Sequence, residues 1–153
     1  MLAGLAETEG SVAENSAQDS RPPAATTVAE VMKPALTTAD IHDHVAAAAY
    51  LIKHAGTTAL VVLDSQTGRP IGILTDTDIA HVVADGKNVN DVRIADVMTP
   101  NPAVIDAGTS IRKAAELMTA RHFRHLPVVG DSGLTGIVDV SDLCRALLGP
   151  EAP

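Results

Sequence analysis

Two stretches of the chain place oxygen-bearing side chains directly after a short β-branched run. Residues 72–79 read GILTDTDI, and residues 136–143 read GIVDVSDL. In each stretch the β-branched run predicts a buried strand, and the apolar spacing that follows predicts a helix. The first N–H groups of a helix lack partners within the helix, and the helix dipole adds partial positive charge there. Either junction could therefore bind an anion such as phosphate.

The same spacing also has a purely structural interpretation. Thr75 precedes Asp78 by three residues, and Asp139 precedes Asp142 by three. This is the spacing of a capping box, in which the two side chains accept hydrogen bonds from the backbone at the helix start. Spacing alone favours capping, so a ligand site at either junction needs further support.

A basic run at residues 121–125, RHFRH, ends an expected helix and leads into the apolar residues LPVV. Basic side chains at a helix C-terminus are favoured by the dipole whether or not a ligand is present. Arginine can also bind phosphate through charge-assisted hydrogen bonds. Arg124 and His125 lie nearest the strand and are the stronger candidates for such a role, and Phe123 is expected to be a core or interface residue.

A metal site is a further alternative. Asp40, His42, Asp43 and His44 carry carboxylate and imidazole groups, which bind zinc and similar ions. Asp43 is better explained as the N-cap of the helix that follows, and alternating histidines before a helix are usually solvated. We therefore expect no metal site.

The order Asp76-Thr77-Asp78 after a strand is similar to the Asp-x-Asp of phosphotransferases that use an aspartate nucleophile. That chemistry needs a larger parallel sheet and a lysine close to the aspartate. Each repeat is too short to supply such a sheet. No Ser/His/Asp or Cys/His arrangement is indicated either, and no catalytic residue is assigned.

The two stretches belong to a longer internal repeat. VAEVMKP at residues 28–34 matches IADVMTP at residues 94–100, and each predicts a short helix stopped by proline. A longer helix is expected from Asp43 in the first copy and from Thr109 in the second, because both residues are good N-caps. The remaining expected elements are extended segments (35–38, 103–105), hairpin strands (59–63, 126–129), hairpin turns (64–69, 130–133) and final helices (77–84, 141–148).

Each long helix has one apolar stripe that predicts packing against a sheet. The stripes consist of Val45, Ala48, Ala49 and Ile52 in the first helix and of Ile111, Ala114, Ala115 and Met118 in the second. Each copy alone has too few strands to close a core, so the two copies are expected to pack together.

Composition narrows the function classes. The 153 residues are 46% hydrophobic but only 1% aromatic, which predicts an aliphatic core. A net charge of −8 disfavours nucleic acid and anionic membranes as partners. No apolar stretch is long enough to cross a bilayer, and the N-terminus lacks the basic region of a signal peptide. Cys144, as the single cysteine, has no internal disulfide partner and is expected to be buried. We therefore expect a cytoplasmic protein.

The repeat resembles a tandem pair of cystathionine β-synthase (CBS) domains, which form a Bateman module. The resemblance rests on VMKP and VMTP, on LPVV at residues 126–129 with its counterpart ALVV at residues 59–62, and on the two glycine-to-aspartate blocks. It implies an α/β (α+β) fold in which two β-α-β-β-α units pack sheet to sheet with pseudo-twofold symmetry. The resemblance implies CBS domains over residues 27–84 and 93–149, joined by a linker over residues 85–92. Residues 1–26 show no sustained hydrophobic period and are expected to form a disordered tail.

The resemblance also implies a ligand. Such modules bind adenosine-containing molecules (AMP, ADP, ATP or S-adenosylmethionine) in the cleft between the domains. The family pattern has glycine, two apolar residues, Ser or Thr, and then Asp after two further residues. The Asp accepts hydrogen bonds from ribose hydroxyls, and the hydroxyl residue and helix start hold phosphate. Carried over from Gly72 onward, this pattern assigns Thr75 and Asp78 to a nucleotide site, with Thr77 as an added donor. The family's base-holding segments, which come from the partner domain, add Pro102, Ala103, Arg124, His125 and Leu126.

The second copy departs from the pattern because Asp139 stands where Ser or Thr is expected, although Asp142 is kept. A carboxylate a few ångströms from a poorly solvated phosphate repels it by several kcal/mol. The weaker second site, composed of Asp139, Asp142, Arg121 and His122, is expected either to be empty or to prefer a ligand without phosphate.

Together, these observations favour a non-enzymatic sensor that binds an adenosine-containing ligand without a required cofactor, forms a homodimer and regulates an unidentified protein. Two alternatives remain open: a dimerisation or scaffold domain with a vestigial cleft, and the aspartate-dependent phosphotransferase.

Overall fold

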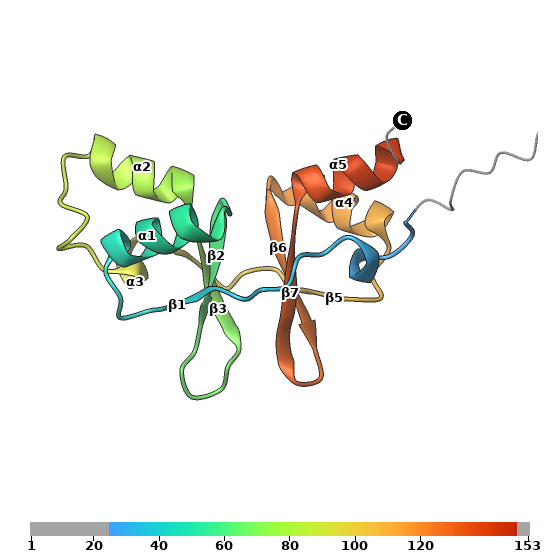
Figure 1. Cartoon of the computed structure of the whole chain (residues 1–153), viewed down its shortest axis with the longest axis horizontal. Helices are drawn as coiled ribbons and strands as arrows, with labels where there is room; N and C mark the ends of the chain where they lie inside the picture. Colours follow the sequence, from blue (N-terminus) through green and yellow to red (C-terminus); the bar gives the residue numbers. More distant parts are fainter. Residues whose placement is uncertain (1–24, 150–153) are drawn as a thin grey trace, which may run out of the picture.

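The computed structural model describes residues 25–149, which form two similar units side by side (Figure 1). The expected disordered tail over residues 1–26 lies outside the described residues, except for its last two. Of these, Thr26 is anchored, because its carbonyl accepts a hydrogen bond from the N–H of Ile111 at 3.0 Å.

The elements follow the expected order in both copies. A 3₁₀ helix, η1 (Val28–Glu30), precedes the first unit, whose elements are β1 (Thr38–Asp40), α1 (Val45–Ala55), β2 (Ala59–Leu63), β3 (Pro70–Thr75) and α2 (Asp76–Ala84). The second copy comprises α3 (Ile94–Val97), β4 (Thr99–Pro100), β5 (Ile105–Asp106), α4 (Ile111–Arg121), β6 (His125–Gly130), β7 (Gly133–Asp139) and α5 (Val140–Leu148). None of these helices is long and apolar enough to span a membrane.

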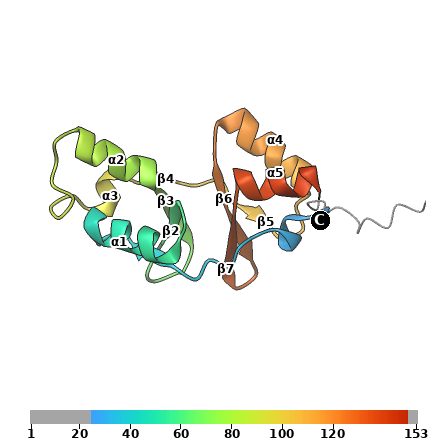
Figure 2. The same ribbon diagram turned by 45° about the horizontal axis from the view of Figure 1, so that its top comes forward.

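The strands form two separate small sheets. The first has the order β1-β2-β3-β4 and the second β5-β6-β7. In each, the first strand runs parallel to its neighbour, and the two hairpin strands are antiparallel. The hairpins β2–β3 and β6–β7 meet in the middle of the molecule, and the long helices lie on the outer sides (Figures 1 and 2). The predicted fold class is confirmed.

Each copy contributes its first short helix to the core of the other. Val28 of η1 is fully buried in the core of the second unit, whereas Ile94 of α3 is fully buried in the core of the first. Backbone hydrogen bonds hold this exchange: the N–H of Val28 donates to the Thr109 carbonyl at 2.9 Å, and the N–H of Ile94 donates to the Asp43 carbonyl at 2.9 Å. The two units therefore complete each other's cores.

The exchange explains why the long helices begin one residue later than expected. The N-caps are His44 and Ser110 rather than Asp43 and Thr109. Asp43 and Thr109 lie outside the helices because their carbonyls accept the hydrogen bonds from the exchanged segments. The predicted apolar stripes are confirmed: Val45, Ala48, Ile52, Ile111, Ala114 and Met118 are buried, and Ala49 and Ala115 are partly buried.

The prediction for Cys144 is wrong, because its thiol is exposed. In α5 the buried positions are Asp142 and Leu143, and Ala146 packs partly against the core. Cys144 follows these two buried residues on a short amphipathic helix and points away from the core.

A methionine packs over a glycine at each place where the chain crosses between units. A Cβ atom at Gly72 would collide with the Sδ atom of Met98. A Cβ atom at Gly136 would lie 2.8 Å from the carbonyl oxygen of Lys33 and 2.9 Å from the Sδ atom of Met32. The segments also pair with the glycine strands, as β4 with β3 and as a bridge between Lys33 and Ile137. The glycines of the two blocks therefore make room for the methionines of VMTP and VMKP.

This packing predicts that Gly136→Ala destabilises the protein. The added methyl group meets a backbone carbonyl that cannot move without breaking the strand pairing, so we expect the free energy of unfolding to fall by about 1–3 kcal/mol. Gly108→Ala is the matched control, since its nearest neighbour is a flexible side-chain oxygen of Asp106 at 3.2 Å. Urea denaturation followed by circular dichroism measures both, and equal stability of the two variants would contradict this account.

Candidate functional site

A cavity of about 570 Å³ lies between the two units. Most of its lining residues fall in three groups: the starts of α2 and α5, the segment that crosses from β4 toward β5, and the turn between α4 and β6. The lining residues are Thr58, Ile73, Thr75, Asp76, Thr77, Thr99, Pro100, Asn101, Pro102, Ala103, His122, Phe123, Arg124, His125, Asp139, Val140 and Ser141.

Most of the predicted site residues meet in this one cavity. Six residues of the predicted nucleotide site line it: Thr75, Thr77, Pro102, Ala103, Arg124 and His125. Asp139 and His122, which the sequence analysis places in a second site, line the same cavity. The two repeats therefore contribute to one common space.

Four predicted residues are not among those that line the cavity. Leu126 is fully buried in the core of the second unit, where strand alternation turns it inward. Asp78 and Asp142 are the third residues of their helices and face the backbone they cap. Arg121 is exposed at the end of α4.

The start of α2 is a capping box. The Oγ1 atom of Thr75 accepts from the N–H of Asp78 at 3.2 Å, and Oδ2 of Asp78 accepts from the N–H of Thr75 at 2.8 Å. The hydroxyl of Thr75 also donates to Oδ2 of Asp78 at 3.0 Å. The N–H groups of Asp76 and Thr77 donate to the Thr58 carbonyl at 3.0 Å and to Oδ1 of Asp76 at 2.8 Å. The capping interpretation is thus confirmed at this helix, and the Thr77 hydroxyl remains at the cavity wall.

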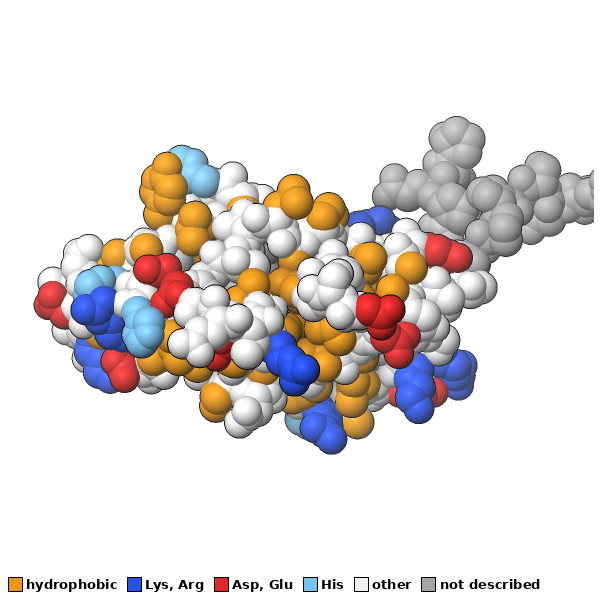
Figure 3. Space-filling view, turned by 90° about the horizontal axis from the view of Figure 1, so that it is seen from below, with side chains coloured by type: hydrophobic (Ala, Val, Ile, Leu, Met, Phe, Trp, Pro, Cys, Tyr) orange, Lys and Arg blue, Asp and Glu red, His pale blue; other side chains and the backbone are white. Residues whose placement is uncertain are grey.

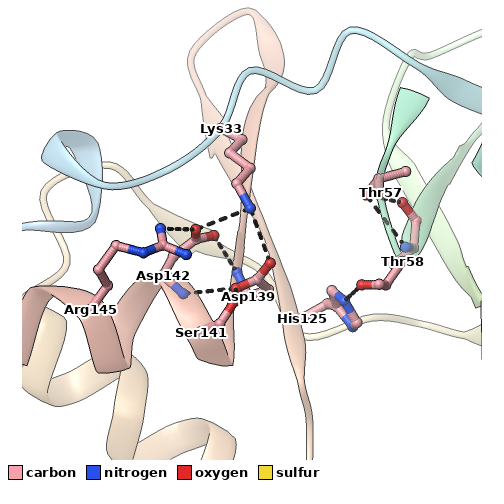
Figure 4. A network of polar contacts seen from close by, with 9 residues as sticks. Lys33, Thr57, Thr58, His125, Asp139, Ser141, Asp142 and Arg145 are labelled. Carbon is pink, nitrogen blue, oxygen red and sulfur yellow. Dashed lines mark hydrogen bonds and ion pairs between the residues drawn. The ribbon is translucent and has the colours of Figure 1, made fainter. Parts of the chain in front are cut away.

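The start of α5 is capped in the same way and carries an ion network (Figure 4). Oδ1 of Asp139 accepts from the N–H of Asp142 at 2.8 Å and from the hydroxyl of Ser141 at 2.6 Å. The ammonium of Lys33 lies 3.2 Å from Oδ2 of Asp139 and 3.1 Å from Oδ1 of Asp142. Arg145 adds a contact of 3.4 Å to Asp142, whose side chain is only 2% exposed. The buried carboxylate of Asp142 is therefore doubly paired.

These contacts shift two ionisation equilibria. Burial raises the pKa of Asp139, but hydrogen bonds from Ser141, the backbone of Asp142 and Lys33 outweigh it and lower the pKa to about 2. Burial lowers the pKa of Lys33, but its bonds to Asp142 and Asp139 outweigh burial and raise it. Asp139 is consequently a carboxylate, and Lys33 an ammonium, throughout the physiological pH range.

His125 connects the two units at the cavity. Its Nε2 atom lies 2.8 Å from Oγ1 of Thr58, which precedes β2 of the first unit. Burial lowers the pKa of His125, and this outweighs the opposing fields of Asp139 and Asp76. At neutral pH the imidazole is therefore uncharged and acts as a hydrogen-bonding group.

Two residues that line the cavity adopt a left-handed backbone. Among residues 25–149, Asn101 (φ 50°) and His122 (φ 57°) are the non-glycine residues with positive φ. His122 is the C-cap of α4, and its counterpart at the end of α1 is Gly56, with φ 65°. Strained residues of this kind cluster at functional sites. The sequence signal for this difference is the glycine in one copy at the position of a histidine in the other.

The geometry can also be compared with the metal-site and phosphotransferase alternatives. Within residues 25–149, no group of three His, Cys, Asp or Glu side chains is close enough to hold a metal ion. Asp76 follows an antiparallel strand of a small mixed sheet, and no lysine is among the residues described as lining the cavity. The arrangement that a phosphotransferase would need is thus not formed around Asp76.

The comparisons with known proteins agree with the fold. The model of the CBS domain matches residues 28–85 and 94–149. The chain therefore belongs to the CBS domain family, and it carries the domain twice.

The relatives include a protein of similar mass and two CBS-domain proteins of known structure. The chain is 37% identical over 125 residues to a 17.7 kDa protein from Acidianus ambivalens, a match that covers 81% of this chain and 70% of that protein. A CBS-domain protein from Burkholderia ambifaria has a similar structure, with a TM-score of 0.73, 30% identity, and coverage of 80% of this chain and 94% of that one. CBSX2 from Arabidopsis thaliana, solved in complex with AMP, has a TM-score of 0.66, 29% identity, and coverage of 80% and 96%.

The backbone at His122 predicts a reciprocal pair of stability changes. A non-glycine residue in the left-handed region costs about 1 kcal/mol, so His122→Gly should raise the free energy of unfolding by up to about that amount. Gly56→Ala should lower it by a similar amount, because nothing lies within 4 Å of the added Cβ and only the backbone conformation is affected. Chemical denaturation of both variants tests this; a destabilised His122→Gly variant beside an unaffected Gly56→Ala variant would refute it.

Proposed function

We propose that this chain is a non-enzymatic regulatory module that binds an adenosine-containing ligand of the AMP, ADP and ATP class in the cleft between its two CBS domains. The observation that carries the proposal is the single cavity in which Thr75 and Thr77 of one domain face Arg124 and His125 of the other. The AMP complex of CBSX2 supports an adenine nucleotide as the ligand.

The lining residues suggest how the ligand would bind. Arg124 is exposed at the cavity and offers a planar guanidinium that can hold a phosphate by two hydrogen bonds. The hydroxyl of Thr77 and the neutral imidazole of His125 are further hydrogen-bonding groups. Pro102 and Ala103 form an apolar wall on the crossing segment, suited to the face of a base. Such a ligand would contact both domains and would favour the arrangement in which it binds best.

A ligand in this cleft would act by holding two parts of the chain together. We assign the domains to residues 27–84 and 93–149, joined by residues 85–92, with residues 99–103 crossing back along the cavity.

S-adenosylmethionine is an adenosine-containing ligand that carries no phosphate. A scaffold with a vestigial cleft is the competing function, and it predicts no response to any adenosine ligand.

The proposal predicts that Arg124→Ala weakens AMP binding about tenfold or more, because a charge-assisted hydrogen bond to phosphate is lost. Isothermal titration calorimetry with AMP, ADP, ATP and S-adenosylmethionine measures the affinities. Arg112→Ala is the matched control, since Arg112 pairs with Glu116 on the surface of α4 and does not line the cavity. Unchanged affinity in Arg124→Ala would refute the site, and no binding of any of the four ligands would favour the scaffold.

We further infer a homodimer, formed through apolar side chains left exposed on the helices. Tyr50, Val83 and Leu147 are 62%, 63% and 64% exposed, respectively. On the face shown in Figure 3, acidic and basic side chains are interspersed with hydrophobic ones. Sedimentation velocity should show a dimer that Tyr50→Ser together with Leu147→Ser converts to a monomer; a wild-type protein that is monomeric at all concentrations would contradict the inference.

A further inference from the structure

The charged side chains around the cavity are unbalanced. The carboxylates of Asp76 and Asp139 line it, one at the start of α2 and one at the start of α5, and Arg124 is the one arginine among the described lining residues. His125 is uncharged at neutral pH because burial lowers its pKa. Lys33 and Arg145 are nearby cations, but they are paired with Asp139 and Asp142 and are not among the residues that line the cavity.

Each carboxylate already occupies the helix start that would otherwise bind an anion. Oδ1 of Asp76 accepts from the N–H of Thr77 at 2.8 Å. Oδ1 of Asp139 accepts from the N–H of Asp142 at 2.8 Å and from the hydroxyl of Ser141 at 2.6 Å. A phosphate at either helix would have to displace a resident carboxylate or stand beside it. A long polyphosphate is therefore disfavoured at both helix starts.

We propose that the cavity selects a nucleoside monophosphate over the corresponding di- and triphosphates, and that Asp76 and Asp139 determine this selectivity. The inference rests on the proposed function of the same cavity. One phosphate can be matched by the single guanidinium of Arg124. Each additional phosphate adds negative charge near two carboxylates and finds no further arginine or lysine among the described lining residues.

Calorimetric titration with AMP, ADP and ATP, in the presence of EDTA to remove divalent cations, tests this order. We expect AMP to bind at least about tenfold more tightly than ATP, with ADP between them. Unit charges about 10 Å apart at an intermediate dielectric interact strongly enough for an affinity ratio of this size.

Two carboxylate variants and one control distinguish the effect of charge at the cavity from the effect of the protein's overall charge. Asp139→Ser keeps a hydroxyl that can cap α5, and Asp76→Asn leaves the network of α5 intact. Each should improve ATP binding about tenfold while changing AMP binding less. Asp131→Asn removes the same charge from the exposed β6–β7 turn, away from the cavity, and should leave the AMP-to-ATP ratio unchanged.

The outcomes separate this inference from the function on which it rests. ATP binding as tightly as AMP in EDTA would overturn the selectivity but leave the nucleotide site standing. So would an ATP affinity that exceeds that of AMP once Mg²⁺ is added, because the carboxylates would then act as metal ligands. If no nucleotide binds at all, the proposed function fails and the selectivity with it. If the ratio of AMP affinity to ATP affinity were unchanged in both Asp139→Ser and Asp76→Asn, groups other than these two carboxylates would be responsible for the selectivity.

Discussion

The close crossing of a methionine over a glycine, made once in each direction, is the contact on which the rest of the structure depends. Met98 crosses Gly72, and Met32 crosses Gly136, at distances that leave no room for a Cβ atom. Each crossing brings a short helix into the core of the other unit, where Val28 and Ile94 are fully buried. Neither unit can close its core alone. The residues that follow Met98 are thereby held along the cavity.

At the cavity, the same local pattern at a helix start can either cap the helix or bind an anion. A capping box satisfies the first N–H groups of a helix, and an anion site needs those same groups free. In α2 the cap uses the Thr75 hydroxyl, and Thr77 remains available at the wall. In α5 the cap is the carboxylate of Asp139, which Lys33 further holds in its ionised form. The two copies are therefore similar in fold but differ in the side chain that caps the helix at the cavity they share.

Two residues that line the cavity have a strained backbone conformation. Asn101 and His122 adopt a left-handed backbone beside it, whereas the position equivalent to His122 in the first unit is a glycine. The Thr58–His125 contact joins the two repeats across the cavity through residues that are not equivalent, because β6 pairs His125 with Asp139 as β2 pairs Ala59 with Thr75. A ligand that contacts both units would meet different chemical groups on each.

Local patterns in the sequence were sufficient for the long helices and the hairpin strands, and the family resemblance implied the fold class. The first strands of the two sheets, β1 and β5, lie later than the extended segments expected at residues 35–38 and 103–105. The strand at residues 59–63, the buried stripes of α1 and α4 and both capping boxes depend on interactions within a few residues, which spacing encodes. The N-caps at His44 and Ser110 were missed because the exchanged segments donate hydrogen bonds to the carbonyls of Asp43 and Thr109. The exposure of Cys144 was missed because it depends on how α5 is rotated on its sheet. Only the tertiary structure placed Asp139 and His122 in the cavity of Thr75 and paired Lys33 with two carboxylates. Those contacts join residues far apart in the chain, and their geometry is set by the packing of the two units, which no periodicity of a single segment records.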